Sequence, residues 1–248
     1  MQFIGNPARR WGEHRPTLFA GIFDVDGVLL ASPHERAWRE ALEGYADPND
    51  FTTAIYQAQV AGKPRLDGAR AALEAMRVPI ADQKAAAYAE AKQARLEHLI
   101  RAGAVIAFPD ALRFVQAVRG LGWPMAVASS SKNANAMMKP ICLKSGVSLL
   151  DAFSANVCGR DLEHGKPDPE LFLLAASELH IAAEHCFVVE DAQAGIEAAR
   201  AGRMTGLGVA RLGDTALLVA AQADLVVTSL DEVDLGDLAA GRLKRWAG

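Results

Sequence analysis

Cysteine is scarce in this sequence, and no apolar segment is long. Three cysteines occur among 248 residues, an odd number without CxxC spacing, so a disulfide framework is not predicted. We interpret them as small core residues of a protein in the reducing cytoplasm. No apolar run approaches the ~18 uninterrupted residues of a membrane span, so a membrane-spanning class is not expected. The three cysteines are Cys142, Cys158 and Cys186.

Charge of one sign is not in excess either. The formal net charge is -4 and the pI is about 5.9, and no basic run is long enough for a membrane-surface patch. We therefore expect no nucleic-acid and no membrane partner. Residues 1–16 carry three arginines without an apolar core, which argues against a secretory signal and predicts a flexible N-terminal extension. The expectation is a cytoplasmic monomer. The arginines are Arg9, Arg10 and Arg15.

The most informative feature that is present is a pair of aspartates, Asp24 and Asp26, one residue apart. An apolar run from about Leu18 ends directly before Asp24, which predicts a buried strand with both carboxylates at its carboxyl end. Ligands of open α/β sheets bind at that edge, and Gly27 allows a sharp turn that gathers the two side chains. Two neighbouring acids repel, so a divalent cation is a natural companion. The motif alone is equally compatible with a turn that only caps the strand.

Further polar groups follow apolar runs or open a helix downstream. Ser129 ends the apolar run that begins at Met125, Lys166 lies in a rigid proline-containing turn, and Glu190 and Asp191 follow a third apolar run. Each group also has a structural alternative. Ser129 and the second acid pair could cap helices, and Lys166 could be a solvated loop residue. Because all of these groups occupy positions expected along one sheet edge, a shared site is the better interpretation.

The apolar pattern divides the chain into a helical segment and an alternating one. Residues 32–104 give helical signals without a strand, beginning with a capping-box sequence at Ser32–Glu35. We predict an α/β core of residues 17–31 and 105–248, a doubly wound, mostly parallel, Rossmann-like sheet, with an all-helical cap domain inserted at residues 32–104. Helices are expected at 33–45, 50–61, 67–78, 82–100, 111–121, 133–146, 169–180, 192–201 and 212–222, and strands at 18–23, 125–129, 153–157, 186–189, 206–209 and 225–227.

The order acid pair, serine, lysine, acid pair resembles the four motifs of the haloacid dehalogenase superfamily of phosphotransferases, over nearly the whole chain from about Thr17. The resemblance implies that Asp24 is a nucleophile that forms an aspartyl phosphate. It also implies that Asp26 is the general acid and base. Ser129 would donate a hydrogen bond to the phosphate, and Lys166 would offset the charge of the nucleophile and the phosphate.

The same resemblance implies Mg²⁺ as the cofactor. Asp24 and Asp191 would bind the ion through their carboxylates and Asp26 through its backbone carbonyl. Glu190 would be a further ligand or the neighbour of one. The cation is needed because phosphoryl transfer places negative charge on the outer phosphate oxygens. No pair of histidines has convincing zinc spacing.

Two short cap motifs, at 34–38 and 62–65, resemble the β-phosphoglucomutase branch of the superfamily. The resemblance implies that Arg65 grips the phosphate farther from the nucleophile, and that five other residues line the substrate cleft with Ser129. Taken singly, Trp38 also fits a cap-core residue and Arg65 a surface charge. The five residues are His34, Trp38, Lys92, Lys132 and Asn133.

Three departures from this branch concern the hinge and the sugar contacts. The segment 30–32 replaces a Thr-Asp-Thr-like hinge, Ala61 replaces a sugar-contacting lysine, and Asp110 replaces a helix-entry glycine. These changes leave the expected phosphotransfer residues intact. They therefore bear on sugar specificity and cap closure more than on the chemistry.

The resemblance predicts a Mg²⁺-dependent phosphotransferase acting on a small phosphorylated sugar. The leading hypothesis is β-phosphoglucomutase activity, which converts β-glucose 1-phosphate to glucose 6-phosphate. A sugar-phosphate phosphatase on the same scaffold is the alternative, and it differs in using water instead of a sugar hydroxyl as the phosphoryl acceptor. A receiver-like signalling module also uses aspartates, Mg²⁺, a hydroxyl and a lysine. It needs no helical lid, however, and its phosphorylated aspartate follows a later strand.

Overall fold

A six-stranded parallel sheet forms the core of the protein. The computed structural model describes residues 17–247, and the predicted extension at residues 1–16 lies outside them. The strands run in the order β5-β4-β1-β6-β7-β8, with β1 (Ala20–Phe23) in the middle. The predicted doubly wound parallel fold is thereby confirmed. The other strands are β4 (Met125–Val127), β5 (Ala155–Asn156), β6 (Cys186–Glu190), β7 (Thr205–Val209) and β8 (Leu225–Val227).

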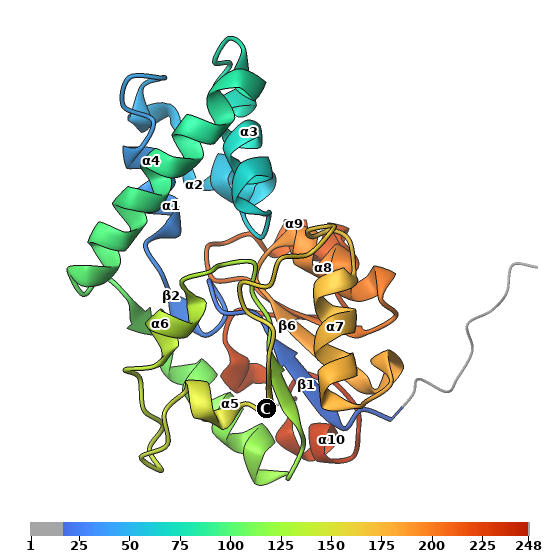
Figure 1. The fold of residues 1–248 in the computed structure, drawn as a ribbon. Coiled ribbons are helices and arrows are strands. Elements are labelled where there is room, and N and C mark those ends of the chain that lie inside the picture. Colours follow the sequence, from blue (N-terminus) through green and yellow to red (C-terminus); the bar gives the residue numbers. More distant parts are fainter. Residues whose placement is uncertain (1–16, 248) are drawn as a thin grey trace, which may run out of the picture.

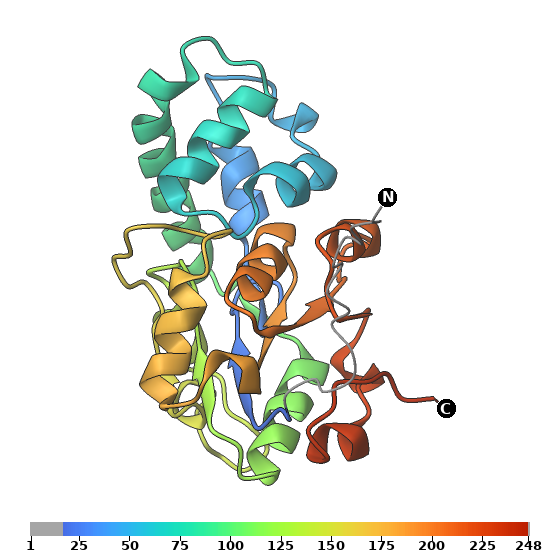
Figure 2. The ribbon, with the colours of Figure 1, turned by 90° about the vertical axis from the view of Figure 1, so that its right-hand side faces the viewer.

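Helices cover both faces of this sheet, as Figures 1 and 2 show from two directions. Successive strand residues point to opposite faces, so Phe23 joins the apolar core on one face while Ile22 joins the core on the other. Strands buried on both faces consist of continuous apolar runs. The core helices are α5 (Pro109–Gly120), α6 (Ala134–Met138), α7 (Glu170–Leu179), α8 (Gln193–Ala201), α9 (Thr215–Ala220) and α10 (Leu235–Ala239), with short 3-10 turns η3 (Leu150–Ala152), η4 (Ala183–His185) and η5 (Leu230–Glu232).

The helical cap is inserted between two short strands, β2 (Leu30–Ala31) and β3 (Ile106–Ala107), which pair antiparallel in a separate sheet. The cap has its own apolar core, in which the Trp38 and Tyr88 ring centroids lie 5.3 Å apart. In Figure 1 it stands above the sheet as a separate layer. Its elements are α1 (His34–Glu40), η1 (Pro48–Asp50), α2 (Thr53–Ile55), the π-helix η2 (Tyr56–Val60), α3 (Arg65–Ala75) and α4 (Ala81–Arg101).

The long helix α4 runs the length of the cap and returns the chain to the core (Figure 1). Its buried residues include Tyr88, Lys92 and Leu96, which follow one another at intervals of four and therefore share one face. Lys92 is the charged member of this face, so the helix delivers an ammonium group to the base of the cap. No helix in residues 17–247 is both long and apolar enough to cross a bilayer.

The predicted helix at 133–146 is wrong beyond its first turns. Helix α6 ends at Met138, and Pro140 follows directly after its C-cap residue, a position where proline commonly stops a helix. Cys142 lies exposed in the loop that follows, so it is not the core residue that we predicted. The three cysteines are exposed, half-buried and buried in chain order.

Two predictions at helix starts in the cap are also wrong. The helix predicted at 50–61 begins later, at Thr53, because the Thr52 side chain caps α2 by accepting a hydrogen bond from the Ile55 N–H at 3.3 Å. The capping box predicted at Ser32–Glu35 does not form. Pro33 occupies the N-cap position of α1, and no side chain caps the helix there.

Candidate active site

The first acid pair lies in a tight turn at the carboxyl end of β1. The Asp24 N–H donates to the Val189 carbonyl of β6 at 3.1 Å, and the Gly27 N–H donates to the Leu30 carbonyl at 2.8 Å. Gly27 has a φ of 81°, which glycine adopts without steric cost. A Cβ atom at this position would overlap the Asp191 carboxylate. The turn therefore brings the two acidic motifs together, and we call residues 24–28 the acid-pair turn.

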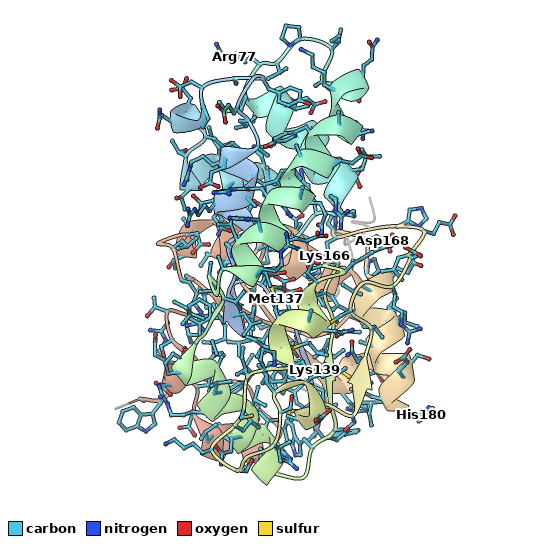
Figure 3. All side chains as sticks on the ribbon, turned by 60° about the vertical axis from the view of Figure 1, so that its left-hand side comes forward. Arg77, Met137, Lys139, Lys166, Asp168 and His180 are labelled. Carbon is cyan, nitrogen blue, oxygen red and sulfur yellow. The ribbon has the colours of Figure 1, made fainter. Side chains whose placement is uncertain are left out.

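Lys166 joins the two acidic motifs through its ammonium group. Its Nζ donates to the Asp24 Oδ1 at 2.8 Å and also donates to the Glu190 Oε1. The residue is 3% exposed, and Figure 3 places it at the level where the cap meets the core. Burial by itself lowers the pKa of Lys166, but the two carboxylates outweigh it and hold the pKa above its ordinary value. The ammonium therefore stays charged across the working pH range.

Glu190 is fully buried and all of its bonds are internal. Besides the bond to Lys166, its Oε2 accepts hydrogen bonds from the backbone N–H groups of Asp191 at 3.0 Å and Ala192 at 3.1 Å. The carboxylate lies against Gly195 at the start of α8, where a Cβ atom would overlap it. Glu190 therefore links Lys166 to the start of α8. Both carboxylate oxygens of Glu190 accept hydrogen bonds.

The carboxylates at this sheet edge carry more negative charge than Lys166 balances. Oxygens of Asp24, Glu190 and Asp191 lie within 4.8 Å of one another. Burial raises the pKa of Asp24 to about 7, with the charges of Glu190 and Asp26 adding to the rise against the pull of Lys166. Burial and the neighbouring carboxylates likewise raise the pKa of Asp191 well above its ordinary value. An oxygen-only donor set with excess negative charge suits Mg²⁺, so the carboxylates of Asp24 and Asp191 fit that cofactor.

Ser129 follows β4 and faces the same edge. It is 3% exposed, and its Oγ accepts a hydrogen bond from the Ser131 N–H at 3.1 Å. The N–H of the preceding residue, Ala128, donates to the Phe23 carbonyl at 2.8 Å, which places the serine beside the end of β1. With its oxygen held in this way, the Ser129 O–H hydrogen is left to donate into the cavity in front of the acid-pair turn.

A cavity of about 490 Å³ lies between the core and the cap, within the usual size range of small-ligand sites. Two polar atoms at its base are notable. Among the described residues, the Asp26 Oδ1 and His34 Nε2 atoms are buried without a hydrogen-bond partner, and unpaired buried polar atoms are rare unless they have a function. Every residue predicted for the site except Glu190 lines this cavity: Asp24, Asp26, His34, Trp38, Arg65, Lys92, Ser129, Lys132, Asn133, Lys166 and Asp191.

Three cap residues form a linked group opposite Asp26. The His34 Nε2 lies 3.6 Å from the Asp26 Oδ2, and the His34 Nδ1 lies 3.0 Å from the Lys92 Nζ. The Lys92 ammonium also lies 4.6 Å from the Trp38 ring centroid. Burial lowers the pKa of Lys92 to about 7 and the pKa of His34 to about 4. His34 is therefore neutral at physiological pH, whereas Lys92 gains or loses its proton within the physiological pH range.

Lys132 and Asn133 reach the cavity but have protein partners. The Lys132 Nζ donates to the Asp161 Oδ1 at 2.7 Å in an exposed pair. The Asn133 and Gln93 side-chain amides exchange two hydrogen bonds of 3.3 Å, which join the core to α4. Asn133 thus contacts the cap, and a ligand that bound either residue would compete with these bonds.

Tyr56 is a cavity residue that sequence reasoning missed. It begins the π-helix η2, and π-turns frequently mark functional sites. Burial and the nearby charges of Asp191 and Asp26 raise the pKa of the phenol well above its ordinary value. The hydroxyl therefore stays protonated and can donate a hydrogen bond. Nothing in the sequence pattern distinguishes a π-turn from an ordinary helical turn.

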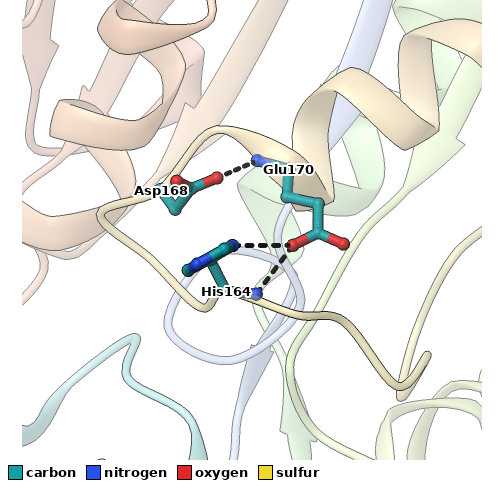
Figure 4. A group of neighbouring side chains, drawn as sticks. All are labelled: His164, Asp168 and Glu170. Carbon is teal, nitrogen blue, oxygen red and sulfur yellow. Dashed lines mark hydrogen bonds and ion pairs between the residues drawn. The ribbon is translucent and has the colours of Figure 1, made fainter.

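A second group of metal-ligand residue types lies on the surface, as Figure 4 shows. The Glu170 Oε2 accepts a hydrogen bond from the His164 N–H at 2.7 Å, and the Asp168 Oδ1 accepts one from the Glu170 N–H at 2.9 Å. These bonds tie the loop that carries Lys166 to the start of α7. These hydrogen bonds explain why the three side chains lie together, so the group does not require a bound metal.

Comparison with known proteins identifies the family. The family model for haloacid dehalogenase-like hydrolases matches residues 20–203. The chain belongs to this family. It is 32% identical to the β-phosphoglucomutase of Mycobacterium bovis, over 86% of this chain and 90% of that protein. It is 33% identical to the fructose-1-phosphate phosphatase YqaB of Escherichia coli, over 77% of this chain and 96% of that protein.

The solved structures agree with this assignment. An archaeal β-phosphoglucomutase from Pyrococcus sp. strain ST 04 superposes with a TM-score of 0.69 at 30% identity, covering 88% of this chain and 96% of that chain. The haloacid dehalogenase-like chain is therefore an enzyme of the phosphatase and phosphotransferase kind, in the β-phosphoglucomutase-like branch. The predicted family and enzyme class are confirmed.

The contact between Glu190 and Gly195 generates the first prediction. Gly195→Ala should displace the Glu190 carboxylate, loosen Lys166, and lower turnover of a phosphate ester by about 10²-fold, because small misplacements at a reacting centre are costly. Overpacking should also lower the free energy of unfolding by about 1–3 kcal/mol. Gly120→Ala is the control, since that helical glycine has open space around it. Aryl phosphate hydrolysis and urea unfolding measure both effects, and wild-type turnover in Gly195→Ala would contradict the role of Glu190.

The raised pKa of Asp24 generates the second prediction. Because folding raises this pKa from 3.8 to about 7, the metal-free protein should lose stability as pH rises through that window. Mg²⁺ binds the ionised carboxylates, so saturating Mg²⁺ should raise the melting temperature by about 5 °C at about pH 8 and by much less at about pH 5. Sodium chloride at equal ionic strength is the solution control.

Two variants locate this Mg²⁺ effect. Asp191→Asn should abolish most of the melting-temperature increase, whereas Asp168→Asn should keep it, because Asp168 belongs to the surface group of Figure 4. Equal increases at both pH values, or a full increase in Asp191→Asn, would show that the ion binds elsewhere.

Proposed function

We propose that this protein is a Mg²⁺-dependent phosphotransferase that acts on a small sugar phosphate through an aspartyl-phosphate intermediate. The observation that carries the proposal is the convergence of three groups in one cavity between the core and the cap. Asp24 is held there by Lys166 at 2.8 Å, and the unpaired Asp26 oxygen lies beside it in the same turn. A nucleophile, a cation and an acid-base group are the parts that such a reaction needs.

In the proposed reaction, a carboxylate oxygen of Asp24 attacks the phosphorus of the substrate. The new O–P bond forms as the bond to the leaving oxygen breaks, and Asp26 gives its proton to that oxygen. In the second half, a hydroxyl group attacks the phosphorus of the aspartyl phosphate and loses its proton to Asp26, while Asp24 leaves as the carboxylate. Lys166 holds one oxygen of Asp24 in place, which leaves the other oxygen for the attack.

Mg²⁺ would be held by the carboxylates of Asp24 and Asp191 and by the backbone carbonyl of Asp26. The ion would supply positive charge against the phosphate oxygens. Both oxygens of Glu190 already accept hydrogen bonds. We therefore assign Glu190 to holding Lys166 and the helix start, and we do not count it as a ligand.

The cap side of the cavity supports a mutase as the more specific function. Arg65 and Lys92 place cationic side chains there, and a mutase must hold the second phosphate of a bisphosphate intermediate. The guanidinium of Arg65 can bind two phosphate oxygens at once. The β-phosphoglucomutase relatives agree with this choice. The fructose-1-phosphate phosphatase relative keeps a sugar-phosphate phosphatase as the alternative, whereas membership of this enzyme family argues against a receiver-like module.

The third prediction tests the two aspartates. With Mg²⁺ and β-glucose 1-phosphate plus a trace of the 1,6-bisphosphate, the wild-type protein should form glucose 6-phosphate. Asp24→Asn should remove essentially all turnover, because an amide cannot attack phosphorus. Asp26→Asn should lower turnover by at least about 10²-fold, while an activated phosphoryl donor still labels Asp24. Glucose 6-phosphate and free phosphate are followed in parallel, and near-normal turnover in Asp24→Asn would exclude Asp24 as the nucleophile.

The fourth prediction separates the mutase from the phosphatase. Arg65→Lys should depress isomerisation at least about 10-fold more than hydrolysis of a small aryl phosphate, since lysine keeps the charge but loses the two-point grip. Arg70→Lys is the matched control, because Arg70 lies on the same helix and pairs with Asp67 and Asp82 at the surface. Equal losses in both assays would argue against a second phosphate site. Faster release of phosphate than formation of glucose 6-phosphate by the wild-type protein would favour the phosphatase.

A further inference from the structure

Arg211 lies two residues after the end of β7 and contacts the acid-pair turn. Its Nε donates to the Gly27 carbonyl at 3.1 Å, and its Nη2 donates to the Val28 carbonyl at 3.1 Å. The side chain is 11% exposed, so these bonds form largely away from bulk water. A planar guanidinium that binds two consecutive carbonyls fixes both the position and the orientation of a turn.

The same guanidinium reaches the linker by which the chain returns from the cap. Its Nη1 donates to the Asp110 Oδ2 at 2.8 Å, and its central carbon lies 3.9 Å from the Phe108 ring centroid. The Phe108 N–H in turn donates to the Leu29 carbonyl at 3.0 Å. Arg211 therefore joins the outgoing and returning linkers of the cap at their base.

Asp110 is itself anchored to the C-terminal part of the core. Its Oδ2 also accepts hydrogen bonds from the Ser229 Oγ at 3.0 Å and from the Leu230 N–H at 2.8 Å. Burial alone would raise the pKa of Asp110, but the bonds from Arg211 and Leu230 outweigh it and lower the pKa. The carboxylate is thus charged, and its Oδ2 atom accepts all three of these hydrogen bonds. It stands where the resemblance led us to expect a glycine.

We infer that Arg211 is a positioning residue for the phosphotransfer reaction, and this inference rests on the function proposed above. It acts through the acid-pair turn, which carries Asp26 and packs against the Asp191 carboxylate. Turnover is sensitive to displacements of about 1 Å at a reacting centre. Loosening the turn should therefore slow the chemical step, while none of the side chains that line the substrate cavity is removed.

The test compares Arg211→Lys and Arg211→Ala with a matched control. Lysine keeps a positive charge for Asp110 but cannot reach both carbonyls, so it separates positioning from charge. Arg113→Lys is the control. Arg113 lies on α5, like Asp110, and joins Asp231 in the adjacent C-terminal turn through an exposed pair whose closest atoms are 2.5 Å apart.

We expect kcat for an aryl phosphate with Mg²⁺ to fall about 10-fold in Arg211→Lys and about 10²-fold in Arg211→Ala. The KM values should stay within about threefold of wild type, because binding groups are not removed. Hydrogen exchange of the amides of residues 27–30, followed by mass spectrometry, should accelerate at least about 10-fold in both variants. The Arg113→Lys control should match wild type in all three measurements.

Unchanged exchange at residues 27–30 in both Arg211 variants would overturn the inference. Faster exchange with unchanged kcat would also overturn it, since the turn would then be held without effect on the reaction. If Arg211→Ala does not fold, Arg211→Lys decides alone. A wild-type protein that hydrolyses neither aryl phosphates nor sugar phosphates contradicts the proposed function instead. The exchange measurement then decides whether Arg211 holds the turn.

Discussion

The buried ammonium of Lys166 is the interaction on which the acidic edge of the sheet depends. The parallel fold brings the ends of β1 and β6 side by side, so the two acidic motifs that follow them must meet. Without a cation their burial would be unfavourable, because like charges repel strongly in a medium of low dielectric constant. Lys166 bonds to one carboxylate of each motif. The remaining negative charge raises the pKa of Asp24 and Asp191, and it creates the demand for a divalent ion.

The core and the cap each contribute side chains to the cavity. Strand ends of the core supply the acids and the serine, and the loop before α7 supplies Lys166. The cap supplies His34, Lys92 and Trp38 from its own helices, and these three contact one another as well as the cavity. The two parts are connected by the short β2–β3 sheet, and the largely buried Arg211–Asp110 pair joins the chain segments next to these strands.

The predictions from sequence were best where chain order alone determines position. The acid-pair turn, Ser129 and Asp191 follow apolar runs that predicted strands of one mostly parallel sheet, so the sequence placed them at one sheet edge. The order of the strands came from the structure. Errors occurred where a single residue sets the end or the start of a helix against the apolar pattern. Pro140 follows the end of α6, and Thr52 caps the start of α2. The strands β2 and β3 have two residues each, too few for any periodic signal. Tyr56 was missed because a π-turn has no distinguishing sequence pattern.

By itself the sequence determined the fold class, the family resemblance and the chemical types gathered at one sheet edge. These follow from apolar runs, strand-end positions and motif order, which are local properties of the chain. Only the tertiary structure decided that His34 meets Lys92, that Asn133 pairs with Gln93, and that both Glu190 oxygens accept hydrogen bonds. It also showed that Asp110, which the sequence marked only as a departure, is the partner of Arg211. Such contacts join residues far apart in the chain, and their side-chain directions are set by how the cap and the C-terminal segments pack on the sheet.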